Sequence, residues 1–274
     1  MADPTPDPAV VAAASNTDRF YTEVKSLHEF DKLEVRCVID TLLSKAQEET
    51  CYEASYVRTV SNIESLLVLQ GSKDVQAIAM LARALFELAV DMRLLEMTPR
   101  GWIRKIAHSD VEKLRLANRI IEFKSANPTV QTDTSVYQKH IDQNSVRVTA
   151  LQKSIWPKIK NPKHWSGTNL ADRCTALKAP FDQMYAEDYA RLSWYVHPGL
   201  AGITHVPHAA FIHMCGYAYH LSAKAYEQSL LTMIRVFKLS KGNDHIENRL
   251  DAAMKFPFAD TDEAVLALRR RAGL

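Results

Sequence analysis

The sequence predicts an all-α protein built as a multi-helix bundle, and three observations lead to this prediction. Glycine is scarce, with 8 residues among 274, or about 3% against a usual level of roughly 7%. Apolar residues recur every three or four positions through most of the chain, as on one face of a helix. No segment alternates β-branched and polar residues as a half-buried strand would. The scarcity of glycine also argues against Rossmann, P-loop and glycine-rich β folds.

The composition is that of a soluble globular protein that buries a sizeable core, with 47% hydrophobic and 24% charged residues. No run of about 18 apolar residues exists, so no transmembrane helix is expected. The first residues, MADPTPDPAVVAAAS, lack the basic start and long apolar stretch of a secretory signal. Four cysteines are scattered without a CxxC pair, as is typical of reduced thiols. We therefore expect a cytoplasmic location.

Prolines and helical periodicity divide the chain into three expected parts. Three prolines in the first eight residues predict a disordered, mobile tail over residues 1–15. A helical bundle domain is expected over residues 16–243. A C-terminal helical extension is expected over residues 244–274, with a weak helix at 262–270.

The first half of the bundle is predicted to hold three helices. Apolar residues near a 3.6-residue period predict a helix over 16–46. A second helix over 52–70 ends at Gly71, which suits a C-cap. The third, over 74–97, is apolar on nearly all sides, so we expect it to pack against several neighbours. Pro99 and Gly101 end it.

The second half is predicted from proline and glycine signals. Helices are expected over 102–126, ended by Asn127-Pro128, and over 134–155, ended by Trp156-Pro157. The loop KIKNPKHWSGTN follows, and Asn169 is expected to cap a short helix that runs to residue 177. Further helices are expected over 181–197, before Pro198-Gly199, and over 207–239, before Gly242.

Charge is distributed unevenly along the chain. Residues 1–99 carry 9 Lys and Arg against 16 Asp and Glu, whereas residues 100–178 carry 15 against 6. The basic middle indicates either an anionic partner or attraction between two parts of one fold. Its loop contains a set of expected nucleic-acid-binding residues: Lys153, Lys158, Lys160, Lys163, His164 and Trp165. The alternative is a solvated loop anchored by Trp156 and Trp165.

The segment AEDYARLSWYVHPG carries the most chemistry. At about 100° per residue, one stripe of this helix is expected to be buried: Phe181, Met184, Tyr185, Tyr189, Leu192 and Val196. Arg191 lies on one border of that stripe, and Ser193 shares the other border with His197. On the opposite side, Ala186, Ala190 and Trp194 indicate a closely packed second surface. We expect a second copy there, so a homodimer.

Three motifs resemble a bacterial helical family of unknown function with HEPN-like character. They are an RxxxE helix (Arg83, Glu87), an HWSG loop that starts at His164, and the segment DYARLSWYVHP. Arg191 and His197, with five residues between them, fit the Arg-x(4–6)-His pattern of the HEPN superfamily. The resemblance covers roughly residues 60–240. It implies a helical bundle, a dimer, and a role in phage defence or a toxin–antitoxin system.

The resemblance also implies metal-independent RNA cleavage, with Arg191, His197 and Ser193 as the expected catalytic residues. An RNA 2′-hydroxyl would attack the adjacent phosphorus, with His197 as general acid or base and Arg191 stabilising the phosphoryl charge. Leu192 departs from the family pattern, which usually has a polar residue after the arginine. The alternative is that Arg191 pairs with Glu187 and that His197 only caps its helix.

Three residues are expected to support this site: Arg83, Glu87 and Asp91. They form one slowly turning row on the most apolar predicted helix. Because buried charges need partners, the row is either a salt-bridged strut or the polar wall of the cleft. In both cases Glu87→Ala is expected to destabilise the fold strongly if Arg83 is buried.

Neither a metal nor another cofactor is expected. Histidines do cluster late in the chain, at His197, His205, His208, His213 and His220, but HExxH is absent and no carboxylate lies between the first and the last. Two functions remain open. The first is a HEPN-like protein of bacterial defence that cleaves RNA, or binds RNA or a nucleotide. The second is a non-catalytic helical domain that binds a partner protein.

Overall fold

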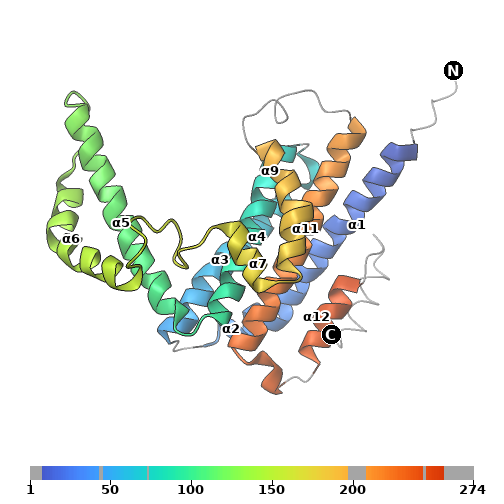
Figure 1. Ribbon diagram of the computed structural model, residues 1–274. Helices are drawn as coiled ribbons and strands as arrows, with labels where there is room; N and C mark the ends of the chain where they lie inside the picture. The colour runs from blue at the N-terminus through green and yellow to red at the C-terminus, as the bar shows by residue number, and fades with distance from the viewer. Residues whose placement is uncertain (1–7, 43–45, 73, 197–207, 243–244, 256–274) are drawn as a thin grey trace. The chain divides into compact units, whose positions relative to one another are not determined.

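A computed structural model of the chain describes residues 8–42, 46–72, 74–196, 208–242 and 245–255, and within these ranges the regular elements are all helices (Figure 1). The predicted all-α class is therefore confirmed. The chain forms two compact units, one from residues 1–97 and 174–274 and one from residues 98–173. The helical bundle domain expected over 16–243 stays a prediction.

The first unit begins with elements that come before residue 98: α1 (Pro8–Phe30), η1 (Asp31–Arg36), α2 (Cys37–Ile39), α3 (Gln47–Val68), η2 (Leu69–Gly71) and α4 (Val75–Met97). Residues 8–15, expected to lie in a disordered tail, instead form the start of α1. Pro8 is the first residue of this helix, where its missing N–H costs no hydrogen bond. Ala13 is already buried.

The rest of the first unit consists of α8 (Phe181–Met184), η3 (Tyr185–Tyr189), α9 (Ala190–Val196), α11 (His208–Val236), η4 (Leu239–Gly242) and α12 (Ile246–Lys255). The predicted helix at 181–197 is thus one α-helix interrupted by a π-helical turn. The weak helix expected at 262–270 lies outside the described residues.

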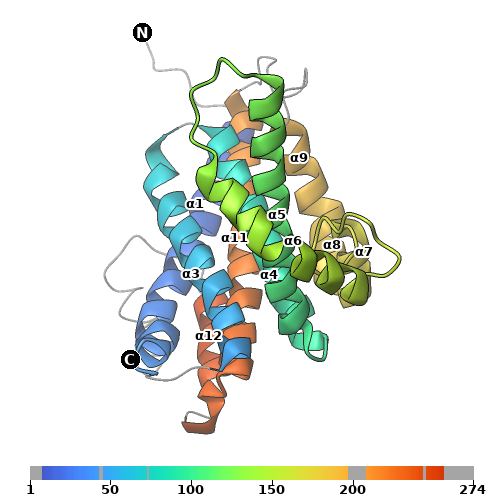
Figure 2. The same cartoon turned by 90° about the vertical axis from the view of Figure 1, so that its left-hand side faces the viewer.

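Four long helices make the core of the first unit, with α1, α3, α4 and α11 side by side (Figure 2). Helix α4 contacts α3, α9 and α11, as its all-round apolar sequence predicted. Its residues Leu85, Phe86 and Val90 have no exposed area, and Tyr226 of α11 is equally buried.

Two π-helical turns interrupt the first unit, and each carries a buried aspartate. Asp31 in η1 is fully buried, and Asp188 in η3 is 4% exposed. Such turns add a residue to the helix and are frequent at functional sites. The sequence analysis predicted ordinary α-helix across both, because the hydrophobic period there differs little from 3.6.

The second unit is a helical hairpin of α5 (Gly101–Ala126) and α6 (Ser135–Ile155), followed by a loop and the first part of α7 (Leu170–Leu177). These bounds lie within a residue of the predicted ones. The unit has its own small core of Ala107, Val111, Leu114, Val148 and Trp156. Asn169 caps α7 as predicted, because its side-chain oxygen accepts the Asp172 N–H at 2.9 Å. No described helix is both long and apolar enough to cross a membrane.

Candidate functional site

Arg191 lies exposed on α9, and its guanidinium carbon is 4.4 Å from the centroid of the Tyr217 ring on α11. The expected pairing with Glu187 is not present. Glu187 instead accepts hydrogen bonds from the Gln183 side chain at 3.2 Å. Within the described residues no carboxylate lies at ion-pair distance from Arg191, so its N–H groups remain available to an anion.

The predicted partner of Arg191 cannot be placed. His197 and His205 lie outside the described residues, so the Arg191–His197 pair stays a prediction. Ser193 is half-buried, and its hydroxyl donates to the Tyr189 carbonyl at 2.8 Å. This i−4 bond directs the Ser193 hydroxyl toward the backbone of its own helix.

An imidazole that the sequence analysis did not connect with Arg191 lies beside the same tyrosine. The exposed His213 ring meets the Tyr217 ring edge-on, with centroids 4.6 Å apart. The Arg191 guanidinium and the His213 imidazole are therefore each within 4.6 Å of one ring centroid. An arginine of α9 and a histidine of α11 thus share one tyrosine as a neighbour.

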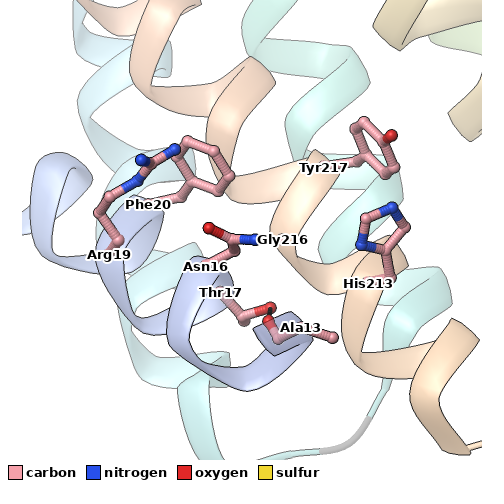
Figure 3. Close-up of a pocket in the computed structure, with 8 residues that line it drawn as sticks. All are labelled: Ala13, Asn16, Thr17, Arg19, Phe20, His213, Gly216 and Tyr217. Atoms are coloured by element: carbon pink, nitrogen blue, oxygen red, sulfur yellow. Dashed lines mark hydrogen bonds between the residues drawn. The ribbon is translucent and has the colours of Figure 1, made fainter. Parts of the chain in front are cut away.

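Tyr217 and His213 also line a pocket of about 190 Å³ between α1 and α11 (Figure 3). Helix α1 contributes Asn16, Arg19 and Phe20 to the opposite wall. Asn16 is exposed at the pocket, whereas Arg19 is half-buried and stacks its guanidinium 4.4 Å from the centroid of the Phe20 ring. Sequence analysis missed this pocket because it placed the end of the disordered tail next to Asn16.

The two helices come close together at the floor of this pocket. A Cβ on Gly216 would lie 2.9 Å from Thr17 Oγ1, closer than ordinary contact allows. The Thr17 hydroxyl itself donates across the interface to the Ile212 carbonyl at 2.8 Å. Glycine at position 216 is therefore what lets α1 approach α11 here.

Arg83 and Glu87 meet through a third residue. The Tyr189 hydroxyl donates to Glu87 Oε1 at 2.6 Å and accepts from Arg83 Nη2 at 2.8 Å. Burial, with the nearby Glu87 carboxylate, raises the pKa of Tyr189 to about 12. Arg83 is half-buried and Glu87 is exposed. Through Tyr189, these two residues form a hydrogen-bonded link between α4 and η3. Neither these two residues nor Asp91 lines the described pocket.

The aromatic residues of the HWSG loop do not offer a stacking surface. Trp156 and Trp165 are each 3% exposed, and Trp156 Nε1 donates to the Trp165 carbonyl at 3.0 Å. The expectation that Trp165 stacks on a base is therefore corrected, and both tryptophans anchor the loop. The four lysines remain exposed: Lys153, Lys158, Lys160 and Lys163.

His164 is held inside the loop by two neighbours. Its Nε2 lies 2.8 Å from Arg173 Nη1, and its Nδ1 lies 2.8 Å from Ser166 Oγ. The Ser166 backbone N–H also donates to Nδ1, at 3.1 Å. Both ring nitrogens are thus engaged by residues of the loop and of α7, so His164 positions the loop.

Sequence analysis also missed a buried network around Asp31. This fully buried carboxylate accepts hydrogen bonds from Tyr226 at 2.7 Å, from Arg36 at 2.9 Å and from the Tyr56 hydroxyl. Burial and the Asp31 charge raise the pKa of both tyrosines. With three donors on one carboxylate and no solvent access, the network ties η1 to α3 and α11. The five-residue spacing of Asp31 and Arg36, which a π-turn favours, was the available signal.

The histidines do not form a metal centre within the described residues, where no group of three His, Cys, Asp or Glu side chains is placed to bind an ion. His220 packs against Phe20, with ring centroids 4.4 Å apart. Burial, together with the charges of Lys224 and Arg19, lowers the pKa of His220 to about 4.

Comparison with curated proteins and with solved structures finds no match. Comparison with protein families does find one, over residues 54–208. The matched region contains Arg83, Glu87, Arg191 and His197, but not Asn16 or His213. Because it covers more than half of the 274 residues, the chain belongs to the family of unknown function DUF5677.

Proposed function

We propose that this protein is a HEPN-like protein of bacterial defence or toxin–antitoxin type that binds RNA and cleaves it without a metal ion. The observation that carries the proposal is the exposed Arg191 guanidinium stacked on Tyr217, whose ring also contacts the His213 imidazole. Stacking restricts the side chain, so less entropy is lost when the guanidinium binds a phosphate. Arg191 would neutralise that phosphate through its forked donors.

Metal-independent cleavage of RNA needs only a base, an acid and a cation, which imidazole and guanidinium groups supply. A base takes the proton of the RNA 2′-hydroxyl, the 2′-oxygen attacks the adjacent phosphorus, and the bond to the 5′-oxygen breaks as that oxygen receives a proton. The products are a 2′,3′-cyclic phosphate and a 5′-hydroxyl. Arg191 would stabilise the charge on the phosphoryl oxygens. His197, from the motif, and His213, which contacts the same tyrosine as Arg191, are the candidate acid and base, since an imidazole can both accept and donate a proton.

The second unit supports an RNA ligand through its charge. Residues 98–173 carry 14 Lys and Arg against 6 Asp and Glu, a net charge of +8. Lys153, Lys158, Lys160 and Lys163 are exposed on or near its loop and would contact phosphates without reading sequence. The buried tryptophans leave this contact purely electrostatic.

A cleavage assay tests the proposal. The wild type should cut a 5′-labelled single-stranded RNA in the presence of EDTA and leave a 2′,3′-cyclic phosphate. Arg191→Ala and His197→Ala should each lower the rate at least about a hundredfold with unchanged circular dichroism. Arg58→Ala, which removes an exposed arginine of α3, should cleave like the wild type. Undiminished cleavage by Arg191→Ala would show that the proposal is wrong.

A different surface supports a second proposal, that the protein forms a homodimer. Trp194 on α9 is 71% exposed, and Ala186 and Ala190 on the same side are exposed as well. A large apolar side chain on a face of small residues suits contact with another helix. We infer a second copy of the chain as the occupant, which makes the protein a homodimer.

Light scattering after size exclusion tests the homodimer. The wild type should have the mass of a dimer, and Trp194→Glu that of a monomer. Val57→Glu, which changes an apolar residue of α3 that is 59% exposed, should leave the dimer intact. A dimer that cleaves no RNA under any condition above would favour the interaction domain over the nuclease.

A further inference from the structure

We propose that the pocket between α1 and α11 receives one unstacked base of a single-stranded RNA whose adjacent phosphate contacts Arg191. This inference rests on the proposed function and names the form of RNA that the site selects. Tyr217 connects the pocket with Arg191, because its ring lines the pocket and the Arg191 guanidinium stacks on the same ring. A ligand that fills the pocket and reaches Arg191 therefore spans about one nucleotide.

The size of the pocket limits its occupant. Its volume of about 190 Å³ is below the roughly 300–1,000 Å³ of most sites for drug-sized ligands. One ring system fits, but not a base pair or a dinucleotide. A base of a duplex would first have to leave its stack, whereas a single strand presents its bases already unpaired.

The chemistry of the walls suits a nucleobase. Figure 3 shows Arg19 and Phe20 at one end of the pocket, Tyr217 and His213 at the other, and Asn16 between them. Phe20 and Tyr217 give the walls aromatic carbon that a base can pack against, and a guanidinium lies over each of the two rings. Asn16 offers an amide donor and acceptor, the pair that hydrogen-bonds the edge of an adenine.

Arg19 places a positive charge in the wall of the pocket. Its Nε is buried without a hydrogen-bond partner, and the nearest carboxylate oxygen, on Glu23, is 3.9 Å away. This ion pair with Glu23 leaves Arg19 a half-buried cation that attracts an anionic ligand to the pocket.

Binding measurements with the full chain test this inference. The probe is a fluorescent five-nucleotide adenine RNA with 2′-fluoro groups, which cannot be cleaved, compared with the same pentamer lacking its bases. Asn16→Trp should fill the pocket and weaken binding of the adenine pentamer at least about fivefold, without changing the affinity for the abasic one. Asn248→Trp, at an exposed position of α12, should bind both like the wild type. Asn16→Asp, which keeps the size of the side chain, should also weaken only the adenine pentamer.

The outcomes separate this inference from the proposed function. Equal affinity of the wild type for both pentamers, or an Asn16→Trp variant that binds like the wild type, would overturn the base pocket alone. Binding that depends on the base, together with undiminished cleavage by Arg191→Ala, would overturn the nuclease alone. Adenosine monophosphate serves as a competitor. If adenosine monophosphate competes for binding to the wild type but not to Asn16→Trp, the pocket also binds free nucleotides. If it does not compete for binding to the wild type, the pocket binds a base only as part of an RNA strand.

Discussion

The Tyr189 hydroxyl determines what Arg83 and Glu87 contribute to stability. It binds both side chains, and its ring lies 4.7 Å from the Arg83 guanidinium carbon. Arg83 therefore keeps a partner when Glu87 is removed, and Glu87 itself is exposed. We therefore expect Glu87→Ala to lower the free energy of unfolding by less than about 1.5 kcal/mol, whereas the sequence predicted a strong destabilisation.

Tyr189→Phe is predicted to cost more than Glu87→Ala. It removes both hydrogen bonds and leaves a half-buried guanidinium with one fewer acceptor, which should lower the free energy of unfolding by about 1–3 kcal/mol. Urea denaturation measures both changes. Tyr185→Phe is the control, since its ring stacks on Tyr189 and its hydroxyl makes no hydrogen bond within the described residues. A loss for Tyr185→Phe as large as for Tyr189→Phe would contradict the bridging role.

His220 is predicted to make stability depend on pH. Its pKa is about 4 in the folded chain, against about 6.5 when unfolded. Between these values the unfolded state binds a proton that the folded state does not, so unfolding becomes easier as the pH falls. With partial exposure taken into account, about 1–2 kcal/mol should be lost between pH 7 and pH 5. This contribution is fully present above pH 6.5.

The comparison of two variants isolates this histidine. Buried Glu23 and Asp188 and half-buried Glu227 have raised pKa values. They act in the opposite direction, so the total pH dependence has no simple sign. Between pH 7 and pH 5, the free energy of unfolding of His220→Leu should fall by about 1–2 kcal/mol less than that of the wild type. His245→Leu, at an exposed position, should lose as much as the wild type. Equal slopes for all three proteins would exclude the effect.

At the scale of single residues, the sequence predicted which side chains are exposed better than it predicted which side chains contact one another. Helical spacing placed Arg191 at the border of the buried stripe and Leu192 inside it, and Leu192 is fully buried. Trp165 was assigned to a stacking role because a tryptophan among lysines looks the same in a sequence whether it is exposed or buried. The contact of Arg191 with Tyr217 joins positions 26 residues apart on different helices, and no local pattern encodes it.

At the scale of helices, the crossing of α1 and α11 depends on Gly216. Gly216→Ala places a methyl group 2.9 Å from Thr17 Oγ1 and should cost about 1–3 kcal/mol through overpacking. In a Thr17→Ala background the clashing atom is gone, and the same change should be neutral or stabilising by up to about 1 kcal/mol, because alanine favours helix. Chemical denaturation of the four proteins measures the coupling. Additive effects would show that the contact is not tight.

Helix ends were predictable where proline, glycine or a capping residue marks them. The bounds of α4, α5 and α6 agree with the prediction within a residue, because Gly101, Asn127 and Trp156-Pro157 interrupt a strong period. The start of α1 at Pro8 was not predicted, since proline suits both a tail and a first helical turn. The turns η1 and η3 were not predicted either. They depend on where Asp31 and Asp188 are buried, which is a tertiary property.

At the scale of the molecule, the division into two units separates the charges. Residues 98–173 carry a net charge of +8, whereas the other unit carries 20 Lys and Arg against 26 Asp and Glu, a net charge of −6. The uneven distribution was visible in the sequence. That the basic part forms its own compact unit was not, because the hairpin of α5 and α6 has the same helical period as the bundle.

This separation predicts how RNA binding responds to salt. If the exposed lysines contact phosphates, each contact adds about 0.7 to the slope of log affinity against log salt concentration for a single strand. Changing Lys158, Lys160 and Lys163 to Glu should therefore lower that slope by about 2 and weaken binding at low salt. A control with Lys25, Arg58 and Lys238 changed to Glu alters the net charge equally, at exposed positions of the first unit. It should keep most of the slope, because a contact is lost only where a phosphate was bound. Equal losses in both variants would mean that overall charge, and not the basic unit, attracts RNA.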